Sequence, residues 1–515
     1  MSEPTLSRPA TGAAERRLRA VCDLSMATVR EEGGRHEYDG RVQDLSAEGV
    51  KAGLARLAPE GGERLPDRWE EAHLAAFENG LRFAFHELEL HRRDPWLHLA
   101  NLDLSVYERE YAPLADRLAA RHRHLANWPD AVDMAVTTLD RVSAPAAAAL
   151  LGAARGLADG LQGEDRTTEA ARRAHQRLLT HLVRAAEEGD PDASLGAQGL
   201  AGLMGAAEGV ELDLSRLADR AEEERRRLTD MLGEACALID PARRPAELVP
   251  ELLADHPTAD RVIAEATAVT AEAIAFTRAH RLTPDLDGEC RVGPAPESRR
   301  WVKAMLTWAA PNESDAPSRY CVTPPDPSWP ADRVEEWLTI FSATTLPAIT
   351  VHEVAPGHFA HGRALRRVAG PVRRTLLSQT FMEGWAHYAE EVCLEEGFRS
   401  GDPRFAVGVA LEGLCRVVRL TCAIGLHTGA FDVAEATRRF MADALLPRAT
   451  AESEAHRGTF DATYGRYTWG KLAMMDLRER ARAAAGPAFS LERFHRSVLA
   501  LGCPPLAVLP AVFEE

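Results

Sequence analysis

The segment LSRLADRAEEERRRLTDMLGEACAL, residues 214–238, decides the fold class of this sequence. Its leucines recur at helical spacing and charged residues fill the positions between them. This pattern is typical of a long helix whose charges lie on the outer, solvated face. Apolar stripes with the same spacing occur in residues 74–85 and 178–185. Because alternating strand patterns are scarce, we expect a mainly α fold with at most a small edge sheet.

Residues 288–330 interrupt the helical pattern with dense prolines, as in GPAPES and TPPDPSWP. Proline density of this kind forbids a continuous helix. We place a domain boundary here, between an N-terminal helical lobe, 1–287, and a metal-binding catalytic lobe, 288–515. The stretch SRYCVT, residues 318–323, is either an edge strand to which a peptide-like substrate could pair, or a surface loop.

The composition narrows the class of partner and compartment. Among 515 residues, Asp and Glu exceed Lys and Arg, with a formal charge of -17. Such a surface repels phosphate backbones and anionic lipids, so neither nucleic acid nor membrane is an expected partner. The eight cysteines form no C-x-x-C pair, which argues against a cysteine zinc knuckle and favours a reducing compartment. With no visible signal peptide and no long apolar run, we expect a cytoplasmic protein.

The strongest chemical signal is VHEVAPGHFA, residues 351–360. In the zinc-hydrolase pattern H-E-x-x-H, two histidines four positions apart share one helix face. Here His358 follows His352 by six positions, which would rotate the two side chains apart on an unbroken helix. Pro356 cannot continue a regular helix, and Gly357 tolerates unusual backbone angles. Together they would permit a bulge that returns His358 towards His352.

A site with two histidines needs at least one further protein ligand. In FMEGWAHYAEE, residues 381–391, the side chains of Glu383, His387 and Glu390 share one helix face. We predict Glu383 as the third ligand of one zinc ion per chain, with an open position for water. Glu390 is the reserve ligand, or a carboxylate that orients a metal-bound imidazole. Glu353 would be the general base. Divalent ions other than zinc also suit the same ligands.

Several segments resemble one known family. HEVAPGH, EGWAHYAEE, GLHTG and the C-terminal GRYTWGKL and LERFHRSVLALGCPPL, in this order, are similar to the bacterial "domain of unknown function 885" family. The upstream RRDPWLHLANLDLSVYEREY and PPDPSWPADRVEEWL are similar as well, so that the resemblance covers most of the chain. It implies a zinc metallopeptidase-like protein with a gluzincin-like catalytic lobe, the three metal ligands named above and a catalytic Glu353. It also points to His427 and Tyr467.

The sequence departs from that family around the metal core. Phe359 and His361 stand where the family often has a second histidine and a glutamine, and Ala423 stands where it often has an aspartate. DATYGR, residues 461–466, replaces a stretch that is usually similar to P-G-Q-A. The substrate therefore stays open between a peptide, a small amide and a pathway metabolite. His361 could also replace His358 as a ligand, although a hydrogen-bonding role is the stronger expectation.

The predicted chemistry is cleavage of an amide by metal-activated water. Zinc lowers the pKa of its water to about 7, and Glu353 would pass the proton from this water to the leaving amine. His427 and Tyr467 are candidate donors to the oxyanion. An arginine fork binds a carboxylate through two hydrogen bonds. The candidates for holding a substrate carboxylate are Arg419, Arg466 and Lys471.

Two other functions fit the same residues. A metal-dependent lyase would use the same site but would incorporate no solvent oxygen into its product. A non-catalytic helical binding module would keep the metal for stability, and such structural sites usually have four protein ligands.

Overall fold

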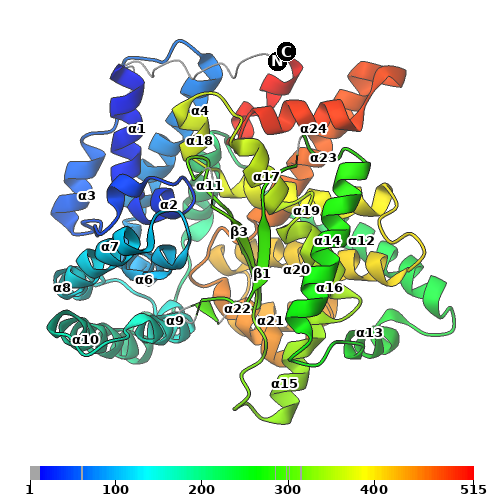
Figure 1. Ribbon diagram of the computed structural model, residues 1–515, viewed down its shortest axis with the longest axis horizontal. Helices are drawn as coiled ribbons and strands as arrows, with labels where there is room; N and C mark the ends of the chain where they lie inside the picture. Colours follow the sequence, from blue (N-terminus) through cyan, green and yellow to red (C-terminus); the bar gives the residue numbers. More distant parts are fainter. Residues whose placement is uncertain are drawn as a thin grey trace.

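The computed structural model describes residues 12–59, 62–284, 286–296, 299–300, 302–313 and 316–514. Helices dominate the described part of the chain, as the sequence predicts, and the strands are few and short (Figure 1). The first ten helices are α1 (Gly12–Leu24), α2 (Met26–Glu31), α3 (Ala47–Leu54), α4 (Arg68–Arg82), α5 (Leu90–Arg93), α6 (Pro95–Leu102), α7 (Leu114–Ala126), α8 (Trp128–Thr138), α9 (Ala144–Gly156) and α10 (Arg166–Glu188).

The remaining elements follow in three groups. Four helices precede the sheet: α11 (Gly196–Glu208), α12 (Leu214–Ile239), α13 (Pro245–Ala254) and α14 (Val262–Ala279). The strands are β1 (Cys290–Gly293), β2 (Ala304–Thr307) and β3 (Ser318–Val322). The last helices are α15 (Ala331–Leu338), α16 (Thr345–Glu353), α17 (His358–Leu365), α18 (Pro371–Thr375), α19 (Gln379–Glu395), α20 (Arg404–His427), α21 (Val433–Asp443), α22 (Arg448–Arg457), α23 (Arg466–Ala485) and α24 (Leu491–Ala500).

The predicted apolar stripes form buried helix faces. Leu74 on α4 and both Leu178 and Leu182 on α10 have no exposed surface. The side chain of Asp165 accepts hydrogen bonds from the backbone N–H groups of Thr167 and Thr168, and thereby caps the start of α10. Amphipathic spacing and capping residues therefore explain where these helices lie and which face they bury.

Helix α12 has the predicted length but not the predicted surroundings. Its leucines, Leu228 and Leu232 among them, pack in one core with Leu414 and Val417 of α20. Glu224 is almost completely buried and pairs with a lysine of α23, so the prediction that all charges lie on an outer face is wrong. A sequence pattern gives the spacing of charges on a helix but not which neighbouring helix supplies their partners.

The sheet has the order β1-β3-β2, with β1 parallel and β2 antiparallel to β3. The stretch 318–323 is therefore neither an edge strand nor a loop. β3 is the central strand, and Tyr320 and Val322 have no exposed surface. Strand β2 is an edge instead, and Figure 1 shows the sheet near the middle of the molecule.

The predicted domain boundary near residue 288 crosses hydrophobic cores that both sides share. One core joins Leu228 to Leu414, and another joins Leu282 to Trp385. The division into 1–287 and 288–515 stays a prediction, and the packing of these cores ties the two segments closely together. Within the described residues, no helix has the length and apolarity needed to span a bilayer.

Candidate functional site

The motif at residues 351–360 lies where one helix ends and the next begins. Helix α16 ends at Glu353 and α17 begins at His358, so the predicted break falls between them. A Cβ atom on Gly357 would lie 1.8 Å from the carbonyl oxygen of His352, a distance that no side chain tolerates. Glycine therefore lets the backbone fold back on itself. The rings of His352 and His358 end up 4.8 Å apart and nearly perpendicular.

Helix α19 brings a carboxylate to these two histidines. Oε2 of Glu383 lies 3.4 Å from Nε2 of His352 and 3.3 Å from Nε2 of His358. The helix packs very close to α23. A Cβ atom on Gly384 would lie 2.4 Å from the backbone of Gly470, so only a glycine permits this approach. The close contact of the two backbones fixes the place of Glu383. We name His352, His358 and Glu383 the triad.

The spacing of the triad matches a tetrahedral metal site. Two ligand atoms that lie about 2.1 Å from a tetrahedral zinc ion are about 3.4 Å apart. All three donor atoms lie within 4.8 Å of one another. Oε2 of Glu383 is buried and has no hydrogen-bond partner among the described residues, so it is available to a cation. On these distances the triad fits a divalent ion of the zinc type.

The charge state of the triad follows from its own contacts. Burial acts to raise the pKa of Glu383, but the imidazoles of His358 and His352 hold it well below its usual value. Burial acts to lower the pKa of His352, yet its contacts with Glu383 and Glu390 raise it to about 9. The carboxylates of Glu383 and Glu390 thus favour a positive charge on the imidazole of His352 between them. A bound cation would displace the proton from that ring.

Glu390 orients His352 from the other side of the ring. Nδ1 of His352 donates a hydrogen bond to Oε1 of Glu390 at 2.7 Å. Oε2 of Glu390 accepts one from Arg416 at 3.1 Å. Despite burial, the Arg416 guanidinium and His387 hold the pKa of Glu390 well below its usual range. Of the two roles that the sequence left open, the geometry places Glu390 in the orienting one.

The other two histidines considered as ligands lie outside the triad. Nε2 of His361 donates to the carbonyl oxygen of Gly502 at 3.0 Å, which is the hydrogen-bonding role favoured by the sequence. Nδ1 of His387 lies 3.6 Å from Glu390. Burial lowers the pKa of each ring to about 4, so both are neutral at physiological pH.

Glu353 is the last residue of α16 and lines a cavity of about 1770 Å³ together with the triad. Its carboxylate makes no hydrogen bond or ion pair with any described residue. Tyr467 lies on the same wall, with its ring 6.4 Å from that of His352 and inclined by 26°. Two of the three predicted catalytic residues, Glu353 and Tyr467, therefore face the same space as the triad.

His427 lies far from the triad. Its Nε2 donates to the carbonyl oxygen of Gly458 at 2.9 Å. On α20 it follows Arg416, which contacts the triad's partner Glu390, by eleven residues, or about 16 Å at 1.5 Å per residue. It lines a remote part of the cavity, and burial lowers its pKa. We therefore leave His427 out of the chemistry proposed below.

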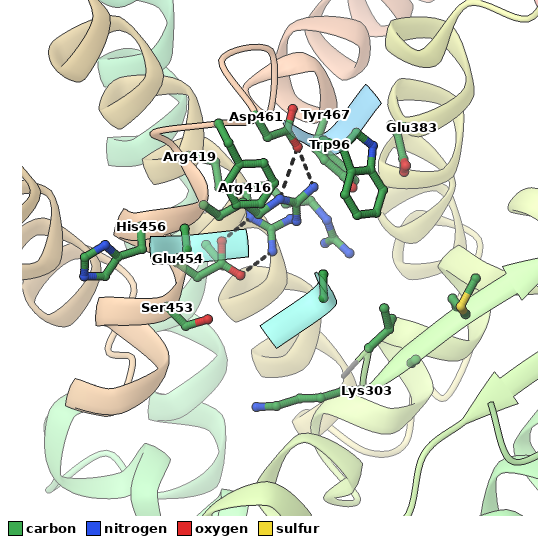
Figure 2. Close-up of a pocket in the computed structure, with 18 of the residues that line it drawn as sticks. Trp96, Lys303, Glu383, Arg416, Arg419, Ser453, Glu454, His456, Asp461 and Tyr467 are labelled. Atoms are coloured by element: carbon green, nitrogen blue, oxygen red, sulfur yellow. Dashed lines mark hydrogen bonds and ion pairs between the residues drawn. The ribbon is translucent and has the colours of Figure 1, made fainter. Parts of the chain in front are cut away.

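The three residues predicted to hold a substrate carboxylate already have acidic partners. Lys471 has no exposed surface and binds Glu224 at 2.6 Å and also Glu391. It does not line the cavity, so the prediction for Lys471 is wrong: its ammonium joins α23 to α12 and α19. Arg419 and Arg466 do line the cavity, but each already binds a carboxylate. Arg419 pairs with Glu454 (Figure 2), and Arg466 pairs with Asp461.

Two cavity residues from the N-terminal part of the chain were not predicted from the sequence. Glu32 follows α2 and accepts a hydrogen bond from Nε2 of Gln379 at 2.8 Å, one helical turn before Glu383 on α19. Burial, with the neighbouring Glu31 and Glu383 carboxylates, raises the pKa of Glu32 to about 8. Trp96 of α6 also lines the cavity (Figure 2). Nothing local in the sequence marks Glu32, because its partner Gln379 lies hundreds of positions away along the chain.

Residues 28–512 match a family model described as "Bacterial protein of unknown function (DUF885)". The chain belongs to this family. The match spans the triad and Glu353, so the site lies inside the DUF885 region. The family's description states no activity, and the peptidase activity implied by the resemblance stays a prediction.

Two solved structures share the DUF885 chain's fold over nearly its whole length. One is described as a "putative lipoprotein of unknown function from Shewanella oneidensis"; it has 19% identity and a TM-score of 0.74, and the alignment covers 98% of this chain and 100% of that one. The other, a "putative lipoprotein from Colwellia psychrerythraea", has 17% identity, a TM-score of 0.72, and coverage of 97% and 98%. No curated protein sequence matches this chain. At these identities the likeness concerns the fold alone, and the cytoplasmic location stays a prediction.

Proposed function

We propose that this DUF885 protein is a zinc-dependent hydrolase that cleaves an amide bond in a peptide or in a smaller metabolite. The observation that carries the proposal is the convergence of His352, His358 and Glu383, with O–N distances of 3.3 and 3.4 Å. The carboxylate that orients His352 and the adjacent, unpaired Glu353 support it further. The triad and Glu353 thus line one cavity, and Glu390 lies buried behind His352.

Each of these residues has a separate task. A zinc ion held by the triad would supply Lewis acidity, which polarises a carbonyl group and makes water acidic near neutral pH. Glu353 accepts the proton of the attacking water and delivers it to the leaving nitrogen. The hydroxyl of Tyr467, on the cavity wall beside His352, donates to the oxygen of the carbonyl as negative charge develops there.

The walls of the cavity favour an extended, peptide-like substrate. Strand β2 is hydrogen-bonded to β3 on one side only, and Ala304, Met305 and Thr307 of this strand line the cavity. An extended segment can add to such an edge through its backbone. The cavity volume of about 1770 Å³ also exceeds the roughly 300–1,000 Å³ of most small-molecule sites.

The same geometry weighs against a purely structural metal. Structural zinc sites usually have four protein ligands, and among the residues that the structure describes the cluster consists of the triad alone. A free carboxylate beside a triad that opens to a large cavity is typical of a catalytic site. A lyase would use the same residues, and the products distinguish it.

The metal content of purified protein tests the proposal. We expect about one zinc per chain in the wild type and none in Glu383→Ala. Glu395→Ala is the matched control, because Glu395 ends the same helix and pairs with Arg478 instead. A wild type that binds no metal when zinc is supplied overturns the proposal. If zinc is present, cleavage in ¹⁸O-labelled water must label the product acid, whereas an unlabelled product assigns a lyase.

A further inference from the structure

Lysine is rare in this chain, and one of its few lysines lies in the cavity. The 61 basic residues include only three lysines, Lys51, Lys303 and Lys471. Lys51 is exposed on α3, and Lys471 is completely buried between two glutamates. Lys303 is half-buried on the cavity wall, directly before the edge strand β2. Its place is unlike that of the other two.

The ammonium group of Lys303 has no acidic partner among the described residues. Nζ lies 5.1 Å from the centre of the Trp337 ring. The backbone is held in place, because the N–H of Thr323 donates to the carbonyl oxygen of Lys303 at 2.9 Å. Figure 2 shows the side chain extended from the strand towards the helix that carries Ser453 and Glu454.

Three arginines in this part of the cavity differ from Lys303, because each already binds a carboxylate. Arg419 binds Glu454 through two hydrogen bonds of 2.7 Å. Arg457 and Arg466 share a single partner, Asp461, at 2.9 and 2.7 Å. The dashed lines in Figure 2 mark such pairs. Among the described basic residues here, the exposed Arg333, which lies over the Trp329 ring, also has no carboxylate partner, and Lys303 is the half-buried one that is left to bind something else.

Acidic side chains lie around Lys303 without pairing with it. Glu336, Glu412 and Glu454 line the same cavity, but no described carboxylate lies within ion-pair distance of its ammonium group. Burial lowers the pKa of Lys303, although Glu336 and Glu454 act in the opposite direction. A buried charge without a partner is unfavourable, and an incoming anion would relieve that cost.

We infer that the cavity recognises a carboxylate on its substrate and that Lys303 is the residue that binds it. The inference rests on the proposed function, since this carboxylate belongs to the amide that the triad would hydrolyse. A monoanion suits one free ammonium group, which acts as a point charge. The apolar lining nearby, Trp337 and Ile340 among it, suits the uncharged part of the same molecule.

Because lysine is scarce, carboxylate binding at Lys303 can be tested by chemical modification, without an assay of enzyme activity. Reductive methylation with formaldehyde, read by mass spectrometry of lysine-containing peptides, reports Lys303 and Lys51 separately in one sample. We expect N-acetylated amino acids with a free carboxylate to protect Lys303 at least tenfold, and their carboxamides to give no protection. Lys51 is the internal control. Equal protection by acids and amides, protection by inorganic phosphate only, or no protection by any acid of a panel would each overturn the inference.

A second variant separates this inference from the proposed function. Lys303→Met keeps the length of the side chain and removes its charge, and Lys51→Met is the matched control. With an N-acyl amino acid substrate, we expect Lys303→Met to raise KM at least tenfold with little change in kcat, and Lys303→Arg to restore most of the loss. If the enzyme binds zinc and is active, but Lys303→Met does not change KM, the carboxylate-binding role of Lys303 is refuted and the proposed hydrolase activity still holds. If carboxylates protect Lys303 in a protein that binds no zinc, the proposed hydrolase activity is refuted, whereas the anion-binding role of Lys303 still holds.

Discussion

The imidazole of His352 donates from Nδ1 to Oε1 of Glu390 at 2.7 Å. This hydrogen bond leaves the opposite nitrogen, Nε2, facing the carboxylate of Glu383. A histidine ligand whose second nitrogen binds a carboxylate is fixed in tautomer and orientation and is a stronger base. The pair therefore determines which atom of His352 is available to a metal.

Glu390→Gln tests this relationship directly. The amide keeps an acceptor for Nδ1 but loses the negative charge that also binds Arg416. We expect zinc affinity to fall about 10- to 100-fold, because residues that orient metal ligands have effects of this size. Zinc titration against a competing chelator measures it. An affinity equal to that of the wild type would show that Glu390 only fills space, and Glu395→Gln on the same helix is the control.

Glu353→Gln separates metal binding from catalysis. The carboxylate is adjacent to the triad but not part of it, so we expect zinc content to stay at the wild-type level. Turnover should fall by about 10²- to 10⁴-fold, the usual contribution of a general base. Single-substrate kinetics and elemental analysis on the same preparation give both values. Undiminished turnover would assign the proton transfer to another group.

Gly357→Ala should damage the site through the backbone. The added Cβ would meet the carbonyl oxygen of His352 at 1.8 Å, so the turn between α16 and α17 must move. We expect a loss of about 1–3 kcal/mol in the free energy of unfolding, typical of overpacking, together with weaker zinc binding. Urea denaturation measures the first effect.

Gly152→Ala is the natural comparison for that variant. Gly152 lies on α9, and a Cβ there would meet nothing within 4 Å. Alanine should therefore stabilise this helix by about 0.5–1 kcal/mol. Equal effects of the two substitutions would mean that the close approach at Gly357 is unimportant.

Acid should destabilise the protein through its buried, neutral histidines. Burial lowers the pKa of His124 to about 3 and that of His495 to about 4. The unfolded chain binds protons at these rings below about pH 6.5. Since the folded pKa values are the lower ones, the stability they contribute is complete above about pH 6.5 and is lost as the pH falls towards 4.

Urea midpoints between pH 8 and pH 4 measure this effect. Each unit of pKa difference is worth about 1.4 kcal/mol per group. His86→Gln, which removes an exposed ring, should leave the pH profile unchanged. A midpoint that stays constant down to pH 4 would contradict the prediction.

The structure brings together His352, His358 and Glu383, the three ligands predicted from the sequence, and metal binding itself stays a prediction. The six-residue spacing of His352 and His358, with proline and glycine between them, already required a broken helix, and Glu383 lay one segment further on. The partners of charged side chains could not be predicted in this way. Lys471 is a plausible anion-binding residue by composition, and only the packing of α12 against α19 and α23 shows that two glutamates bury it.

The same limit applies to the sheet and to the cavity wall. The residues of β3 were predicted as an extended segment, and they form a strand. The central position of this strand depends on two others that are separated from it in sequence. Lys303 lies on the cavity wall only because the edge strand β2 places it there. The rarity of lysine was visible in the composition and could have drawn attention to this residue.

The packing of α12 against α20 has a consequence for synthesis of the chain. Leu228 leaves the ribosome about 190 residues before Leu414, its partner in the same core, which corresponds to about 10–40 s at ordinary elongation rates. During that interval α12 can pack against α11 and α13, but the part of its apolar face that packs on α20 has no native neighbour and is exposed to other nascent chains. Production in cells should therefore depend on chaperones that shield this helix, and slower translation should lower the yield of folded protein.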